Sequence, residues 1–129
     1  MSDIRPDRVT IRPDRVTGPR HLLAAGGYSL GGLRRLWKET AFRHEAQGGA
    51  AALALLLWTR ASLPELLGFG ALFLLLIAAE ALNTAVEEIV DHLSPGWSAM
   101  ARDAKDLGSL AVLCLLGANG LYLAAVVLG

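Results

Sequence analysis

The acidic side chains of one apolar segment are the residues of this sequence with the clearest potential for chemistry. Glu80 follows the apolar run Leu66–Ala79, and Glu87 and Asp91 come later in the same segment. A helix turns by about 100° per residue, so Glu87 and Asp91 lie within about 20° of Glu80, and Asn83 lies about 60° to one side. Carboxylates are costly inside a membrane helix, and those that occur commonly hold cations, move protons or take part in catalysis.

Further polar groups could meet this stripe near one face of a membrane. One later helical face carries Arg102, Lys105, Asp106 and Ser109, and an N-terminal arm carries Arg20, Tyr28, Glu39 and Glu45. Carboxylates from separate elements, together with a lysine, fit a Mg²⁺–nucleotide site, because Mg²⁺ takes one or two carboxylates plus phosphate oxygens. Lys neutralises phosphate charge, and a further carboxylate could accept the proton of an attacking hydroxyl.

Simpler interpretations of the same residues stay open. The acidic residues at the end of the stripe could be solvated charges at headgroup level, Lys105 and Asp106 could be an ordinary charge pair at a helix start, and Trp97 could be an interface anchor. The three histidines have no ligand spacing, and we assign them no metal. The glycines between 26 and 32 lack the Lys-Ser/Thr and the preceding strand of a P-loop.

The distribution of charge predicts a membrane protein. The chain has 129 residues, 53% of them hydrophobic, and equal numbers of basic and acidic residues, 12 of each. Its mean hydropathy is +0.44. Residues 1–45 carry nine Lys or Arg against five Asp or Glu, whereas residues 46–129 carry three against seven. A basic N-terminal arm before an apolar body predicts a membrane protein with its N-terminus in the cytoplasm. The single Cys114 excludes an intramolecular disulfide.

The N-terminal part divides into a tail and an arm. Residues 1–19 contain the heptad IRPDRVT twice in tandem and two prolines, which predicts a disordered tail without a signal peptide. Residues 20–45 predict an amphipathic surface helix, with apolar residues and Trp37 on one side and basic residues for anionic headgroups on the other. The glycines at positions 26, 27, 31 and 32 favour a break near its middle.

Three membrane spans are expected after the arm, at residues 46–59, 65–91 and 107–128. The first has an apolar part of only about a dozen residues, so it can span only if His44, Glu45 and Gln47 join the same helix. Residues 60–64 predict a short turn, and Pro64 suits the first turn of the next helix. The third span has no charge for over twenty residues and is the firmest. The predicted fold class is therefore all-α.

Three blocks of the sequence resemble the small bacterial integral-membrane diacylglycerol kinases, which form one family with the undecaprenol kinases. The acidic segment from Glu80 to Asp91, EALNTAVEEIVD, resembles the family signature, and AKDLGSLAV at 104–112 and ETAFRHE at 39–45 resemble two further blocks in the family order. The resemblance covers about residues 20–129. It implies a homotrimer of three-span subunits with a surface helix and active sites shared between neighbouring subunits, and it implies no nucleic-acid partner.

The resemblance also implies a role for each matching residue. Glu80 would be the catalytic base, with Asn83 supporting it, and Mg²⁺ would be held by Glu39 and Glu87. The lipid substrate would lie near Glu45, Glu80 and Ser109. ATP would contact Arg20, Tyr28, Glu39, Glu87, Gly96, Trp97, Ser98, Lys105 and Asp106. The arm departs from the family at Gly26-Gly27-Tyr28, where the family more often has one glycine, and this departure bears on the placement of Arg20 and Tyr28. A separate departure is His44, at a position where the diacylglycerol branch often has Gln.

The expected function is ATP-dependent phosphorylation of diacylglycerol to a phosphatidic acid, by direct in-line transfer. An undecaprenol kinase of the same fold is the near alternative. A small ion channel is less favoured, because the outer half of the second span, Leu66–Leu76, offers no polar path. A third class is a non-catalytic assembly protein, which would tolerate Glu80→Gln.

Overall fold

The computed structural model describes residues 17–129, and within that range it contains four helices and no strand. In chain order these are α1 (Pro19–Leu36), α2 (Thr40–Trp58), α3 (Leu63–Leu93) and α4 (Ala99–Leu128). The described residues divide into two units, the first ending at Gly31 and the second comprising Gly32–Gly129. The repeated heptad and most of the predicted 1–19 tail lie outside the described residues. The all-α prediction is confirmed for the part of the chain that the structure describes.

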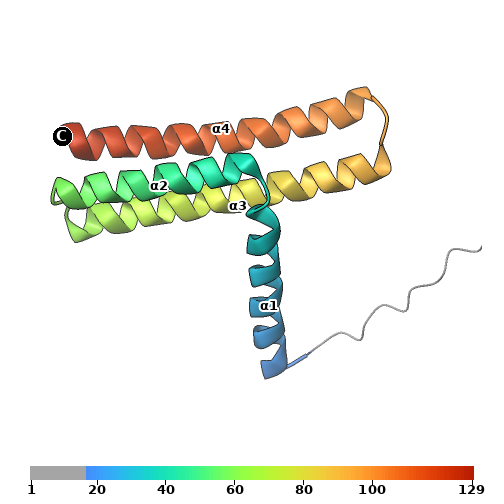
Figure 1. Cartoon of the computed structure of the whole chain (residues 1–129), viewed down its shortest axis with the longest axis horizontal. Helices are drawn as coiled ribbons and strands as arrows, with labels where there is room; N and C mark the ends of the chain where they lie inside the picture. Colours follow the sequence, from blue (N-terminus) through green and yellow to red (C-terminus); the bar gives the residue numbers. More distant parts are fainter. Residues whose placement is uncertain (1–16) are drawn as a thin grey trace, which may run out of the picture. The chain divides into compact units, whose positions relative to one another are not determined.

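In the second unit, α2, α3 and α4 run side by side, and α3 pairs with α4 over most of its length (Figure 1). Leu56 of α2, Phe69 and Leu76 of α3, and Val112 of α4 are buried between the helices. The only buried polar side chains among residues 17–129 are Glu80 and Thr84, both on α3. The packed interior is therefore narrow, and its polar part is confined to one stretch of α3.

The turn between α2 and α3 is short, as the sequence predicts, but α3 begins at Leu63, inside the predicted turn 60–64. Arg60 adopts a left-handed conformation with φ of 58°. The backbone N–H groups of Arg60 and Ala61 donate to the carbonyls of Leu57 and Leu56, which is the Schellman arrangement that ends a helix. Ser62 and Glu65 then form a reciprocal capping box at the start of α3, with Pro64 in its first turn.

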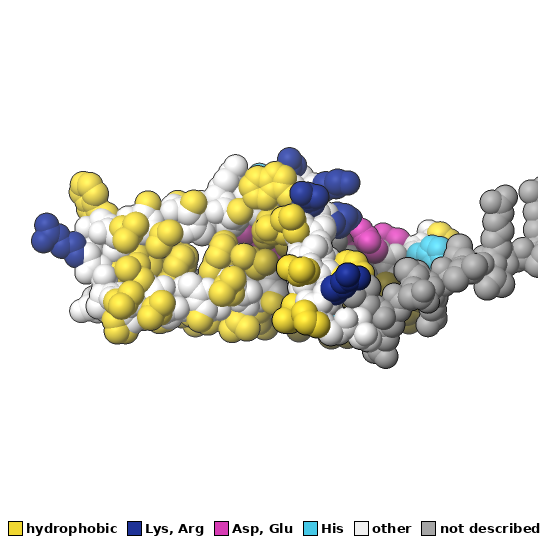
Figure 2. Space-filling view, turned by 90° about the horizontal axis from the view of Figure 1, so that it is seen from below, with side chains coloured by type: hydrophobic (Ala, Val, Ile, Leu, Met, Phe, Trp, Pro, Cys, Tyr) yellow, Lys and Arg dark blue, Asp and Glu magenta, His cyan; other side chains and the backbone are white. Residues whose placement is uncertain are grey.

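Two of the described helices, α3 and α4, are long and apolar enough to cross a bilayer. In their most apolar stretches only 17% of the residues of α3 and 6% of those of α4 are buried. Figure 2 shows hydrophobic side chains covering the end of the bundle that carries the α2–α3 turn. Exposed leucines on this scale suit a surface that faces lipid or another subunit. A third span is not established, since α2 is not among the two candidates.

Polar side chains tie α4 to α3 through main-chain carbonyls. The Tyr122 hydroxyl donates to the Glu65 carbonyl at 2.8 Å. The Asn119 amide nitrogen donates to the Leu72 carbonyl at 3.1 Å and to the Leu115 carbonyl of its own helix at 2.8 Å. Such interhelical bonds stabilise membrane bundles by roughly 0.6 kcal/mol on average. These two contacts fix the register of α4 against α3.

The arm differs from its predicted form in two ways. α1 runs without interruption through all four glycines, and the break comes later, at residues 37–39. There the backbone N–H groups of Lys38 and Glu39 bond to carbonyls three residues back, and Glu39 is extended with φ of −77° and ψ of 125°. Residues 40–45 consequently belong to α2 and not to the arm. His44, Glu45 and Gln47 do lie in the same helix as the predicted first span.

Substituting Gly68 tests the contact between α3 and Tyr122. A Cβ at Gly68 would collide with the Tyr122 hydroxyl, whereas a Cβ at Gly70 would meet nothing within 4 Å. Overpacking of this kind typically destabilises by about 1–3 kcal/mol. We expect Gly68→Ala to lower the thermal unfolding midpoint in detergent and Gly70→Ala, the matched control on the same helix, to leave it unchanged or raise it. Equal midpoints would contradict the packing described.

Candidate active site

One cavity gathers six of the residues that the sequence assigns to the site. It has a volume of about 300 Å³ and is lined by the start of α2 with the residue before it, the second half of α3 and the middle of α4. The six predicted residues in its wall are Glu39, Glu45, Glu80, Asn83, Glu87 and Ser109. Four carboxylates therefore converge from two helices and the break before α2. We call this space the carboxylate cavity.

Glu80 is the most buried carboxylate of the cavity, with only 6% of its surface exposed. Thr84, one helical turn further along α3, is also buried and also lines the cavity. Thr84 is not among the residues predicted from the sequence, although its spacing of four residues from Glu80 places both on one helical face. Its hydroxyl adds a group that can both donate and accept a hydrogen bond beside the buried carboxylate.

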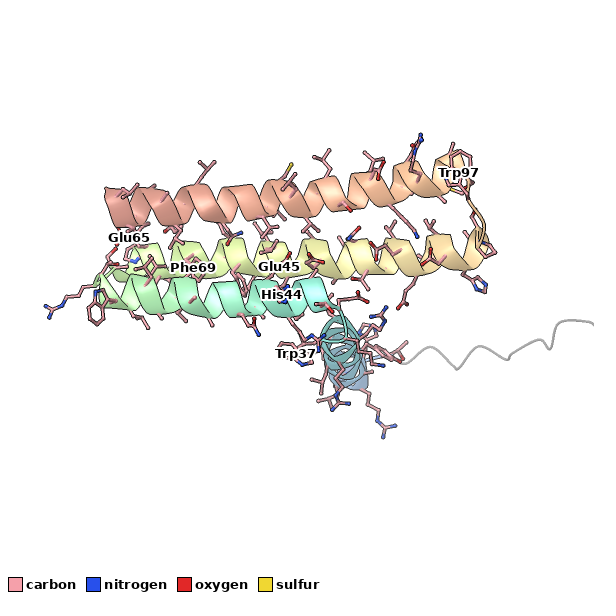
Figure 3. All side chains as sticks on the ribbon, turned by 45° about the horizontal axis from the view of Figure 1, so that its top comes forward. Trp37, His44, Glu45, Glu65, Phe69 and Trp97 are labelled. Carbon is pink, nitrogen blue, oxygen red and sulfur yellow. The ribbon has the colours of Figure 1, made fainter. Side chains whose placement is uncertain are left out.

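Two buried oxygen atoms in the cavity wall have no hydrogen-bond partner within residues 17–129. They are Glu45 Oε2 and Asn83 Oδ1. Figure 3 shows Glu45 on the side of α2 that faces α3. Gly108 of α4 leaves the room that the Asn83 amide occupies, because a Cβ at that position would collide with Asn83 Oδ1. Buried polar atoms are normally paired, so these two oxygens are available to a bound cation or a substrate hydroxyl.

A second cavity of about 380 Å³ lies under the loop between α3 and α4. It gathers the predicted ATP-binding residues Gly96, Trp97, Ser98, Lys105 and Asp106, together with Asp91. The Lys105 ammonium group donates to Asp91 at 2.5 Å. The Ser98 hydroxyl caps α4 by accepting from the Ala101 backbone N–H at 3.1 Å and lies 3.0 Å from the Ser94 hydroxyl. Figure 3 places Trp97 in this loop. We call this space the loop cavity.

The acidic stripe is thus shared between the two cavities. Glu80 and Glu87 face the carboxylate cavity, while Asp91 contributes to the loop cavity. Glu88 lines neither of them and is exposed. Glu88 and Asp91 are both exposed near the end of α3, and each pairs with a basic residue, Arg35 and Lys105 respectively. Their positions match the simpler interpretation that they are solvated charges.

Arg35 is a basic residue at the site that the sequence analysis did not single out. Its guanidinium donates to Glu39 at 2.6 Å and also to Glu88. These hydrogen bonds, first to Glu39 and then to Glu88, raise the pKa of Arg35 above its usual value. Nothing in the sequence distinguishes Arg35 from Arg34 beside it, since the pairing with Glu88 joins residues 53 apart in the chain.

Arg20 and Tyr28 lie on the part of α1 that belongs to the first unit. Both side chains are exposed there, Tyr28 at 75% of its surface. Their predicted contacts with ATP stay a prediction.

The donor set of the carboxylate cavity fits a divalent cation that arrives with phosphate groups. No group of three potential metal-binding side chains is close enough to hold an ion among the described residues. Glu39 and Glu87 nevertheless line the same cavity, and an unpaired oxygen of Glu45 faces it. Mg²⁺ commonly binds through one or two carboxylates and completes its shell with water and substrate phosphates. The residues present therefore fit Mg²⁺ bound with a nucleotide rather than in an all-protein cage.

A third cavity, of about 350 Å³, extends between α2, α3 and α4 and is almost entirely apolar. Its walls include Gly49, Phe73 and Leu116. A Cβ at Gly49 would collide with the Phe73 ring, so this glycine allows the two helices to approach. Glu45 lines both this space and the carboxylate cavity. The apolar cavity is thus adjacent to the buried carboxylates.

Comparison with known proteins gives a consistent result. The family model of prokaryotic diacylglycerol kinases matches residues 27–127. A diacylglycerol kinase of Sinorhizobium sp. is 52% identical over 115 residues, which cover 89% of this chain and 84% of that protein. The diacylglycerol kinase of Haemophilus influenzae is 36% identical over 107 residues, 80% of this chain and 91% of that protein. The diacylglycerol kinase of Escherichia coli K12 is 34% identical over 102 residues, which cover 78% of this chain and 83% of that protein. Together with the convergent carboxylates on membrane-type helices, these matches show that the chain belongs to the prokaryotic diacylglycerol kinase family.

Proposed function

We propose that this lipid kinase transfers the γ-phosphoryl group of ATP to the free hydroxyl of diacylglycerol and so produces a phosphatidic acid. The observation that carries the proposal is the convergence of Glu39, Glu45, Glu80, Asn83, Glu87 and Ser109 on one cavity. Family membership supports the lipid kinase chemistry. The apolar cavity beside Glu45 supports a substrate with a long hydrocarbon part.

Glu80 is the proposed general base. Its carboxylate is buried in the cavity wall, and no Lys or Arg of residues 17–129 forms an ion pair with it. A base without a fixed cation can accept the proton of the lipid hydroxyl as that oxygen attacks the γ-phosphorus. Asn83 and Thr84 lie within one turn of Glu80 and would hold its orientation and that of the hydroxyl. The proton then stays on Glu80 and the leaving group is ADP, with no phosphoenzyme.

ATP is proposed to extend from the loop cavity to the carboxylate cavity. Lys105 lies in the wall of the loop cavity and would neutralise phosphate charge after release from Asp91. Glu39 and Glu87 would hold Mg²⁺, which when bound spreads the charge that develops on the transferred phosphoryl group. Arg20 and Tyr28 are proposed as further ATP contacts.

The proposed setting is the inner membrane, with the N-terminus in the cytoplasm. α3 and α4 are span candidates, and α2 is proposed as a third span. The subunits are proposed to assemble as a homotrimer that shares active sites. Residues 1–19 are proposed to be a dispensable tail. ATP reaches the site from water and the lipid from the bilayer, so a site at the interface allows both to bind.

Phosphoryl transfer from radiolabelled ATP tests the function directly. The purified chain would be assayed with diacylglycerol and with undecaprenol in the same mixed micelles. We expect labelled phosphatidic acid and lower turnover on the polyprenol. Much faster turnover on undecaprenol would favour the undecaprenol kinase. Ion flux in liposomes without lipid-dependent ATP turnover would favour a channel. An absence of any ATP turnover would favour a non-catalytic assembly protein.

Glu80→Gln tests the base. We expect a loss of roughly 10²–10⁴-fold in kcat, because the amide cannot accept the proton. Asp103→Asn is the control, since Asp103 is exposed, lines neither polar cavity and, within residues 17–129, pairs only with its neighbour Arg102. Thermal unfolding and oligomeric state should match the unsubstituted chain in both variants. Turnover of Glu80→Gln near that of the control would remove Glu80 from the role.

Glu39→Gln and Glu87→Gln test the Mg²⁺ ligands. Each change removes a carboxylate, so we expect activity to require more Mg²⁺ in each variant. If both residues hold one metal cluster, the double variant should lose less than the two single losses combined. Activity would be titrated with Mg²⁺ at constant ATP. An unchanged titration with two small, additive losses would show that these residues do not bind the metal.

A further inference from the structure

Arg35 joins two carboxylates from different parts of the second unit. It lies in the last turn of α1, and its Nη1 donates to Glu39 Oε1 at 2.6 Å while its Nε donates to Glu88 Oε1. The side chains of Arg35 and Glu39 are 39% and 36% exposed, and that of Glu88 is 56% exposed. Arg35 itself does not line the carboxylate cavity. Its charge therefore lies beside the cavity and leaves the space inside it free.

Glu39 needs an external partner because its own helix does not hold it. It is the residue before α2, in an extended conformation, and its side chain makes no capping hydrogen bond. A long side chain at a break between helices has many accessible rotamers, and ordering it has an entropic cost. The bond from Arg35 engages Oε1 and restricts these rotamers. Oε2 has no hydrogen bond among those that the structure shows for residues 17–129.

Glu88 connects Arg35 to α3, the helix that carries the proposed base Glu80. It follows Glu87 on α3, about 100° around the helix, so the two carboxylates point to different sides. Glu87 lines the carboxylate cavity and Glu88 does not. Arg35 thus connects Glu39, before α2, to α3 at the level of the second proposed metal ligand.

We propose that Arg35 is a positioning residue that orients the Glu39 carboxylate for divalent cation binding, with Glu88 as its anchor on α3. The inference rests on the proposed function, in which Glu39 is a Mg²⁺ ligand. Carboxylates that bind metals are commonly held by hydrogen bonds from a second residue, and loss of that residue typically lowers metal affinity or activity by roughly 10–100-fold. The guanidinium also offsets repulsion among the converging carboxylates.

Manganese binding gives a readout that does not depend on turnover. Mn²⁺ would be titrated by electron paramagnetic resonance into the full chain in detergent with a non-hydrolysable ATP analogue. We expect Arg35→Gln to weaken Mn²⁺ binding by about 10–100-fold. Arg35→Lys should restore part of the affinity, because lysine keeps the charge but not the fork of donors. Arg34→Gln removes the same charge from the adjacent exposed residue and should bind as the unsubstituted chain does.

Glu88→Gln provides a second line of evidence that leaves the Arg35–Glu39 pair in place. We expect a smaller loss of Mn²⁺ affinity, and the double variant Arg35→Gln/Glu88→Gln should be no weaker than Arg35→Gln alone, because both changes break one connection. Additive losses would overturn the anchoring role. If Arg35→Gln does not fold, the Glu88→Gln and Arg35→Lys titrations decide, and affinities equal to that of the unsubstituted chain overturn the proposal.

The outcomes separate the positioning role from the proposed function. Absence of analogue-dependent Mn²⁺ binding by the unsubstituted chain would contradict the metal role of Glu39 itself. Normal binding by the unsubstituted chain and by Arg35→Gln would contradict only the role of Arg35. Tighter binding by Arg35→Gln would show that Arg35 competes with the cation for Glu39, which also overturns the proposal.

Discussion

The burial of the Glu80 carboxylate is the constraint on which the rest of the site depends. A buried carboxylate is unfavourable unless polar groups surround it. The groups around Glu80 come from three helices: Glu45 on α2, Asn83 and Thr84 on α3, and Ser109 on α4. None of them is a fixed cation, so the carboxylate keeps its capacity to accept a proton or to face a cation. The three helices must therefore pack closely at this one level of the bundle.

The close approach of α4 to α3 at that level follows from small residues and from polar contacts at both ends. Gly108 admits the Asn83 amide. The pair of helices is held at one end by the bond from Lys105 to Asp91 and at the other by the bond from Tyr122 to the Glu65 carbonyl. Contacts at both ends leave little freedom to slide one helix along the other. Ser109 is consequently brought to the same cavity as Glu80.

Residues related by helical spacing were predictable from the sequence, and residues related only by packing were not. The period of 3.6 placed Glu80 and Glu87 on one face, and Thr84 could have been found by the same argument. The pairing of Arg35 with Glu88 has no periodic signal, because it depends on how α1 ends. The break at 37–39 was missed for a related reason. Glycine lowers helix propensity only by about 1 kcal/mol, and α1 tolerates four of them.

The separation of the acidic stripe into two cavities suggests how the proposed reaction divides its tasks. The loop cavity contains a lysine and polar loop residues, whereas the carboxylate cavity adjoins an apolar space through Glu45. One turn of α3, from Glu87 to Asp91, connects the two polar cavities. A nucleotide extended along this turn would place its terminal phosphate toward Glu80. Lipid and phosphate would then meet at Glu80, the most buried carboxylate of the carboxylate cavity.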